Sequence, residues 1–261
     1  MSKLLTSGDP PPFELLRSNG SSPYFFTCDH AGKQLPKALG TLGLSSTDRE
    51  RHIAWDIGAG ALARHLCEWF DATCVLQTYS RLVVDCNRWP HAPDFVTTFS
   101  EDTKIPGNMD LTPEAVDART REIYTPYHET IKALLDRRAT LNKSTVVVAV
   151  HSCTPVYLGV QRPWHIGILY ERDSRLASIL LDILRAGKDV VVGDNQPYFM
   201  TDEKDYSMPI HGERRGLPHV EFEIRQDLIT DEAGQYEWGE RLVDLLQQGL
   251  ERLRDNGHIS R

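Results

Sequence analysis

The sequence lacks the features of a membrane-spanning or secreted protein. No apolar run approaches the roughly 20 residues that a bilayer-spanning helix needs. The N-terminus does not show a charged segment followed by an apolar one, which is the pattern of a secretory signal peptide. We therefore expect a cytoplasmic protein without a membrane partner.

Cysteine is scarce, and its spacing forms no known pattern. The five cysteines are an odd number, and no two of them make a C-x-x-C pair. Such spacing indicates neither a disulfide framework nor a zinc site made of cysteines. We interpret the cysteines as small core residues in a reducing compartment.

Positive charge is also in deficit, because the formal net charge is −8. Binding to nucleic acid requires clustered Lys and Arg that contact phosphates, so this class of partner is not expected. An anionic ligand would need a local cationic pocket. The remaining composition, 40% hydrophobic and 25% charged residues, is ordinary for a globular protein with a buried core.

The order of apolar and polar segments predicts one α/β domain. Residues 1–22 include three consecutive prolines and predict an irregular lead-in, whereas residues 23–261 predict a single domain. Periodicity predicts strands over residues 23–30, 73–78, 81–86, 145–150, 189–192 and 219–225, and helices over residues 55–70, 112–138, 174–186 and 237–255. A strand, a helix and a strand between residues 145 and 192 imply parallel pairing. We expect a mixed, mostly parallel sheet flanked by helices.

Residues 89–110 form a polar, proline-rich connection between two predicted elements. Connections of this length in compact domains are more often functional than not. We expect this segment to form one wall of a functional site.

Two of the predicted strands lead into a histidine, namely His30 and His151. Because the carboxyl ends of parallel strands meet at one edge of an open α/β sheet, these imidazoles could converge. With Asp56 near the start of a predicted helix, they form two histidines and one carboxylate, which is the usual ligand set of a catalytic zinc. Each histidine could instead be a hydrogen-bonded structural residue, and His52 competes with Asp56 as the middle ligand.

Glu223 lies inside the predicted strand of residues 219–225. Burying a carboxylate is costly, which makes an accidental position inside a strand improbable. Alternation places Glu221 and Glu223 on one face and Phe222 and Ile224 on the other. Glu223 is therefore our candidate for general base and acid. A salt bridge to Arg225 or another cation, or an edge strand with its acids in solvent, is the alternative.

Polar residues around residues 80–88 could bind an anionic substrate. An arginine can hold a carboxylate with two parallel hydrogen bonds, so Arg88 with Asn87 suits an amino-acid-like substrate. Arg81 could stabilise a developing oxyanion. Surface ion pairing explains the same arginines equally well.

Two later segments could present further polar groups to the substrate. Asn195 and Tyr198 follow a predicted strand, although turn formation also accounts for this composition. His211 lies in a glycine-flanked loop before the strand of Glu223, where it could bind substrate or be exposed.

Six segments combine the residues discussed above. They are Asp29-His-Ala-Gly32 with Pro36, Trp55-Asp-Ile-Gly58, Ser80-Arg-Leu-Val-Val-Asp-Cys-Asn-Arg88, His151-Ser-Cys-Thr-Pro155, Gly193-Asp-Asn-Gln-Pro-Tyr198 and Phe222-Glu-Ile-Arg225. In this order, from about residue 23 to residue 235, they resemble the N-formylglutamate amidohydrolase family. The resemblance implies a fold of the phosphorylase/hydrolase type, which the family shares with zinc carboxypeptidases.

Parts of the chain are also similar to the carboxypeptidases themselves. The resemblance implies that His151 is the late histidine ligand, that Asn87 and Arg88 hold a carboxylate, and that Glu223 is catalytic. Lys33 stands where the carboxypeptidases have the acid of a His-x-x-Glu pair, so the carboxylate ligand must come from elsewhere. His30 follows Cys28-Asp29 rather than the Ser-Pro of better-known deformylases, which indicates a divergent branch.

The resemblance implies a metal-dependent amidohydrolase of amino-acid metabolism. One zinc per chain, held by His30, Asp56 and His151, would activate water, and Glu223 would move the proton; manganese, iron or cobalt could use the same ligands. The substrate would be a small anionic amide such as N-formylglutamate or another N-acyl amino acid. A carboxypeptidase-like metallopeptidase for short peptides and a non-catalytic metal-dependent binder of an acidic metabolite are the alternatives. The oligomeric state could be monomer or homodimer.

Overall fold

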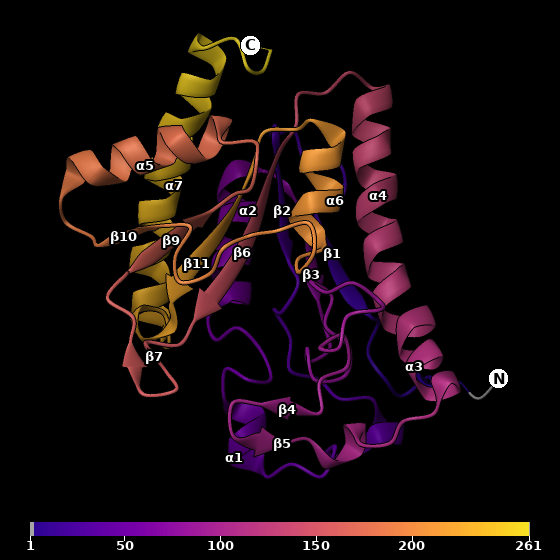
Figure 1. Cartoon of the computed structure of the whole chain (residues 1–261). Coiled ribbons are helices and arrows are strands. Elements are labelled where there is room, and N and C mark those ends of the chain that lie inside the picture. The colour runs from indigo at the N-terminus through magenta and orange to yellow at the C-terminus, as the bar shows by residue number, and fades with distance from the viewer. Residues whose placement is uncertain (1–2, 261) are drawn as a thin grey trace.

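A seven-stranded sheet forms the centre of the molecule (Figure 1). The computed structural model describes residues 3–260. In spatial order, the strands are β1 (Phe13–Leu16), β3 (Thr73–Gln77), β2 (Tyr24–Cys28), β6 (Val146–Cys153), β11 (His219–Arg225), β9 (Ile166–Leu169) and β10 (Val192–Asp194). Four neighbouring strands, β3, β2, β6 and β11, run parallel, whereas β1 and β9 pair antiparallel with β3 and β11. The predicted class, a single α/β domain with a mixed, mostly parallel sheet, is confirmed.

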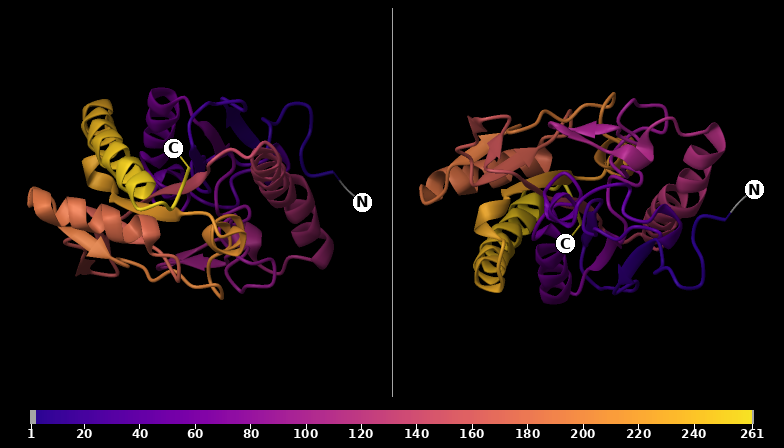
Figure 2. Two further views of the ribbon diagram at one scale, coloured as in Figure 1. Left: turned by 90° about the horizontal axis from the view of Figure 1, so that it is seen from above. Right: turned by 90° about the horizontal axis from the view of Figure 1, so that it is seen from below.

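Helices cover both faces of the sheet, and the two views of Figure 2 show α4 on one side with α5 and α7 on the other. One face carries α2 (Ala59–Phe70), α5 (Arg175–Gly187) and α7 (Glu232–Asp255), and the other carries α4 (Thr125–Thr140) and the short α6 (Ser207–His211). The remaining elements are α1 (Ser46–Glu50), α3 (Pro113–Arg119) and two hairpins, β4 (Phe99–Ser100) with β5 (Thr103–Lys104) and β7 (Val156–Tyr157) with β8 (Val160–Gln161). A π-helical turn, Thr120–Tyr124, joins α3 to α4. Within residues 3–260, none of the helices has the length and apolar character that crossing a membrane requires.

Alternation along the central strands sends their side chains to two different cores. In β11, Val220, Phe222 and Ile224 pack into the apolar cluster that contains α2, α5 and α7. Because successive side chains of a strand point to opposite faces, Glu221 and Glu223 lie on the α4 side. The predicted placement of Glu221 and Glu223 on one face, and of Phe222 and Ile224 on the other, is therefore confirmed.

Residues 81–86, predicted as a strand, fold as consecutive turns. The amide of Val83 donates to the carbonyl of Ser80 at 2.9 Å, and that of Arg88 donates to Asp85 at 3.2 Å. Leu82, Val83 and Val84 are nevertheless buried in the second core, beside α4. The apolar run thus indicated burial correctly, but its local hydrogen bonds make it a turn.

Three other predicted boundaries are corrected by the strand pairings. Residues 13–16, assigned to an irregular lead-in, form the edge strand β1 through antiparallel pairing with β3. The strand that precedes α5 is the short β9, which the sequence analysis missed, and it pairs in parallel with β10. β10 itself covers residues 192–194 rather than 189–192.

Candidate active site

A cavity of about 520 Å³ opens where β2, β6 and β11 reach their carboxyl ends, at the lower end of the sheet in Figure 1. This volume lies in the range of sites that enclose small molecules. The predicted wall is confirmed, since residues of the segment 89–110 line the cavity, namely Asp94, Thr97, Phe99, Ser100 and Glu101.

His30, Asp56 and His151 come together in this cavity, and each is at least 97% buried. One ligand atom from each lies within 4.8 Å of the other two. Oδ2 of Asp56 lies 2.8 Å from Nδ1 of His151 and 3.4 Å from Nδ1 of His30. The local fold sets this arrangement, because the amide of Asp56, just before α2, donates to the carbonyl of His30 at 3.0 Å.

Carboxylates hold the outer nitrogens of both histidines. Nε2 of His30 lies 2.8 Å from Oδ1 of Asp85, and Nε2 of His151 lies 3.3 Å from Oδ2 of Asp29. The hydroxyl of Tyr127 donates to the other oxygen of Asp29 at 2.7 Å. Histidines that bind metals commonly have such a partner, which fixes the ring orientation. Sequence analysis gave no role to Asp29 or Asp85, although Asp29 directly precedes His30.

The charges around the cluster suit a bound cation. Burial alone would raise the pKa of Asp56, but the nearby imidazoles of His30 and His151 lower it. Burial and Arg81 alone would lower the pKa of His30, but Asp85 and Asp56 raise it above its ordinary value. Nδ1 of His30 is buried without a hydrogen-bond partner in the described chain. Two nitrogens and a carboxylate, with Nδ1 of His30 and Nε2 of His151 both lacking a hydrogen-bond partner within residues 3–260, fit a divalent metal.

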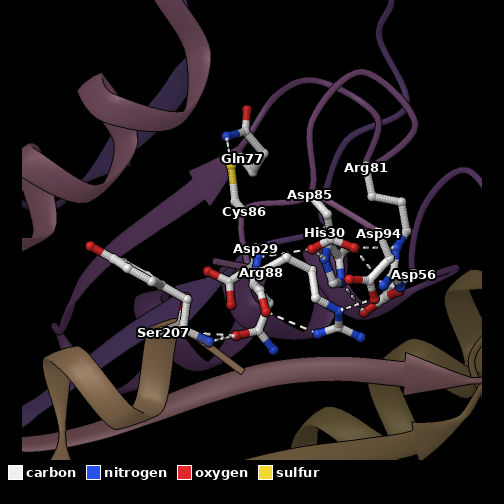
Figure 3. A network of polar contacts seen from close by, with 12 residues as sticks. Asp29, His30, Asp56, Gln77, Arg81, Asp85, Cys86, Arg88, Asp94 and Ser207 are labelled. Atoms are coloured by element: carbon white, nitrogen blue, oxygen red, sulfur yellow. Dashed lines mark hydrogen bonds and ion pairs between the residues drawn. The ribbon is translucent and has the colours of Figure 1, made fainter. Parts of the chain in front are cut away.

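The carboxylates of Asp85 and Asp56 hold Arg81 against the metal cluster (Figure 3). Its Nε and Nη2 donate to Oδ2 of Asp85 at 3.0 and 2.7 Å, and its Nη1 lies 3.6 Å from Asp56. The side chain is 26% exposed and lines the cavity. Arg81 therefore lies beside the cluster, as predicted.

Glu221 and Glu223 reach the cavity from β11, and Glu223 pairs in register with His151 of β6. Burial raises the pKa of each to about 8. Oε2 of each side chain has no hydrogen-bond partner within residues 3–260. Such a carboxyl can be protonated or ionised near neutral pH, as a general acid and base requires.

The two alternatives considered for Glu223 do not agree with the structure. Arg225 pairs with Asp227 at 2.8 Å, and its side chain makes no ion pair with Glu223 within the described chain. β11 lies between β6 and β9, so it is not an edge strand.

Arg88 and Asn87 also line the cavity. Nε of Arg88 donates to Asp94 at 2.7 Å, and its Nη1 donates to Asp205 at 3.1 Å. Both contacts use carboxylates of the protein, so the charge of Arg88 is already compensated. Arg88 lies at the cavity, as predicted, but the carboxylates that it contacts belong to the protein itself.

Hydrogen bonds join the segment 87–89 to the segment 202–207, more than a hundred residues away. Oδ1 of Asn87 accepts from the amides of Tyr206 and Ser207 at 3.1 and 3.0 Å. Nε1 of Trp89 donates to the carbonyl of Asp202 at 2.8 Å. Together with the pair of Arg88 and Asp205, these contacts make one continuous wall.

The remaining predicted residues separate into two groups. Tyr198 lines the cavity, and so does His52, whose Nε2 lies 3.3 Å from Glu101 rather than in the metal cluster. Asn195 and His211 are not among the residues that line the cavity, and their substrate-binding role stays a prediction. Oδ1 of Asn195 accepts from the amide of Tyr170 at 3.0 Å, and so stabilises the loop. His211 is 1% exposed, and its Nε2 lies 3.0 Å from Nδ1 of His128.

The buried cluster and the two protonatable glutamates, at the carboxyl edge of an α/β sheet, are those of a hydrolytic enzyme. The model of the N-formylglutamate amidohydrolase family matches residues 22–230. The chain therefore belongs to this family, and its class is that of enzymes that hydrolyse amides.

Several solved structures are similar to this chain, and two of them show how far the likeness extends. The gene product Atu2144 from Agrobacterium tumefaciens is 37% identical, with a TM-score of 0.94, and the match covers 97% of this chain and 100% of that one. The N-formylglutamate amidohydrolase from Ralstonia eutropha JMP134 is 20% identical, with a TM-score of 0.68, over 93% of this chain and 97% of that one; this likeness concerns the fold. A comparison with curated proteins found no match.

Proposed function

We propose that this protein is a zinc-dependent hydrolase of N-formyl or other N-acyl amino acids, with N-formylglutamate as the first candidate substrate. The observation that carries the proposal is the position of Glu223, a buried and protonatable carboxyl in register with His151. His30, Asp56 and His151 would hold the metal. A ligand set of nitrogen and oxygen suits zinc, and manganese, iron or cobalt could occupy the same site.

The metal and the side chains would have different roles in the reaction. A zinc ion bound at the cluster would polarise the amide carbonyl and make water more acidic. Glu223 accepts the proton of the attacking water and then donates it to the leaving nitrogen. Arg81, held in place by Asp85, stabilises the negative charge that develops on the carbonyl oxygen. From an N-formyl substrate, the products are formate and the free amino acid.

The cavity supports this proposal over the alternatives. A volume of about 520 Å³ fits a small amide better than an extended peptide. A protein that only binds its ligand gains nothing from Glu223, because burying an unpaired carboxyl costs free energy. We therefore favour the amidohydrolase function over that of a metallopeptidase or of a binding protein.

Metal analysis of the purified protein, combined with hydrolysis of a substrate panel, tests the proposal. The panel contains N-formyl and N-acetyl derivatives of glutamate, aspartate, glutamine and leucine, each assayed before and after chelation. We expect about one zinc per chain and release of formate that is lost with a chelator and restored by zinc. Metal without turnover of any panel member would favour a peptidase or a binding protein. Absence of metal after zinc titration would refute the role of the cluster.

A further inference from the structure

Three arginines lie at or beside the cavity, and they differ in how their charges are compensated. Arg81 pairs with Asp85, and Arg88 pairs with Asp94 and Asp205. Arg162 is only 8% exposed, yet within residues 3–260 no carboxylate forms an ion pair with it. A buried charge without an opposite charge is costly, so its presence requires an explanation.

The fold places Arg162 at the carboxyl end of β6, near Glu223. It directly follows the hairpin of β7 and β8, which itself follows β6, the strand of His151. Its amide donates to the carbonyl of Pro155 at 2.8 Å, and its Nη1 lies 3.4 Å from the carbonyl of Thr154. The guanidinium is thus fixed at the carboxyl end of β6. Consistent with this position, Arg162 opposes the burial that raises the pKa of Glu223.

Two tyrosines that line the cavity hold the guanidinium between them. The centre of the guanidinium of Arg162 lies 4.9 Å from the ring of Tyr157 and 4.7 Å from that of Tyr198. Aromatic rings stabilise a cation through their faces and fix its orientation. The guanidinium also has side-chain hydrogen bonds to Cys153 and Tyr198, and its contact with Thr154 is long. Of the five N–H groups of a guanidinium, these contacts leave at least two donors for a ligand.

We propose that Arg162, between Tyr157 and Tyr198, binds a carboxylate of the substrate and so selects acidic amides over neutral ones. This inference rests on the proposed function and adds to it a residue that determines specificity. An arginine matches a carboxylate through two parallel hydrogen bonds, and a substrate carboxylate supplies the charge that the protein does not. Arg81, whose charge is compensated, then stabilises the reacting carbonyl. Arg88, which is also compensated, forms part of the cavity wall.

Substrates that lack one carboxylate test this assignment. The assay compares N-formylglutamate with N-formylglutamine, which lacks the side-chain carboxylate, and with the α-amide of N-formylglutamate. In Arg162→Gln, we expect KM for N-formylglutamate to rise about 10- to 100-fold while kcat changes little, because a hydrogen-bonded charge is lost from binding alone. The variant should also lose the preference for one of the two carboxylates, and this loss identifies which one Arg162 binds.

Controls separate this role from a structural one. Arg185→Gln, which removes an exposed arginine of α5, should leave KM and the preference unchanged. Arg162→Lys keeps the charge and should retain part of the preference, while thermal melting and zinc content report whether each variant is folded. An equal fall of kcat/KM for all three substrates would overturn the proposal. Loss of the preference in Arg88→Gln but not in Arg162→Gln would overturn it too.

Direct binding distinguishes failure of this inference from failure of the proposed function. If the wild-type protein hydrolyses none of the substrates, calorimetric titration with glutamate and with glutamine replaces the kinetic assay. Weaker binding of glutamate to Arg162→Gln would support the carboxylate site without any catalysis. Unchanged binding of glutamine would assign the site to the side-chain carboxylate, and an equal loss for glutamine would assign it to the α-carboxylate. Equal affinities of wild type and variant, or binding of neither amino acid to the wild type, would refute it.

Discussion

The two faces of the central sheet differ along the same strands. Toward α2, α5 and α7, β11 presents Val220, Phe222 and Ile224, and this face is apolar throughout. Toward α4 and α6, the same strand presents Glu221 and Glu223, both of which line the cavity. One face thus supplies burial of apolar surface, and the other supplies protonatable groups. Alternation lets a seven-residue strand do both, because neighbouring residues face different layers.

This difference indicates which buried residues stabilise the folded protein and which lower its stability. Each buried polar group of the cluster costs free energy that apolar burial elsewhere must offset. Functional sites are commonly less than optimal for stability. Residues 222 and 223 therefore offer a direct comparison, since one substitution should affect folding and the other catalysis.

The largest expected effect is on catalysis. Glu223→Gln removes the proton acceptor but keeps the shape of the side chain, so we expect kcat to fall about 100- to 10,000-fold with zinc content unchanged. Steady-state kinetics and metal analysis measure both quantities. Glu251→Gln, on the exposed surface of α7, is the matched control and should retain full activity. Full activity of Glu223→Gln would remove this residue from the mechanism.

The next effect is on stability. Phe222 is fully buried, and Phe222→Ala leaves a cavity in the apolar cluster, which should lower the free energy of unfolding by about 3–5 kcal/mol. Chemical denaturation followed by circular dichroism measures it. Leu141→Ala removes a side chain that is 55% exposed and should change stability by less than about 0.5 kcal/mol. If the two variants were equally stable, the apolar face would not have the structural role given to it here.

The third expected effect concerns the pH dependence of stability in protein stripped of metal. Burial raises the pKa of Glu221 and Glu223 from 4.5 to about 8, so the folded state keeps protons that the unfolded chain loses. Their stabilising contribution is complete below pH 4.5 and is lost as pH rises through about 8, by at most about 1.4 kcal/mol per pH unit for each group. His30 and His151, whose pKa values are also raised, act in the same direction.

Thermal unfolding between pH 5 and pH 8 tests this dependence. We expect the Tm of the wild-type protein to fall in the upper part of this interval, above about pH 6.5, and the fall to be smaller in Glu221→Gln, which cannot ionise. The acids whose pKa values are lowered, Asp29 and Asp56, titrate below this interval. Below about pH 6.5, the histidines whose pKa values are lowered oppose the effect equally in wild type and variant; they are His52, His128, His165 and His211. Identical slopes in wild type and Glu221→Gln would show that this carboxyl is already ionised in the folded state.

The sequence sufficed for features that depend on alternation and on strand ends. The face of Glu223 follows from a period of two, and the meeting of His30 and His151 follows from parallel strands that end at one edge. Asp56 joins them from the start of the predicted helix. The boundaries of β11 were predicted without error.

Features that depend on pairing partners could not be predicted. β1 is a strand because β3 binds its backbone, and residues 81–86 are turns because their amides find local acceptors. His211 looked like part of an open loop, but it packs against His128 from α4. Arg162 becomes notable only because no carboxylate of the described chain compensates it, which no sequence pattern reveals.

The hydrogen bonds between residues 87–89 and 202–207 constrain how the chain can change in length. A residue inserted in either segment would displace Asn87 from the amides of Tyr206 and Ser207, and Arg88 from Asp205. Both segments therefore have to keep their length together, although they are far apart in the sequence. Within residues 3–260, the hairpins of β4–β5 and β7–β8 carry no such links to each other, so the turn of one can change in length without a matching change in the other.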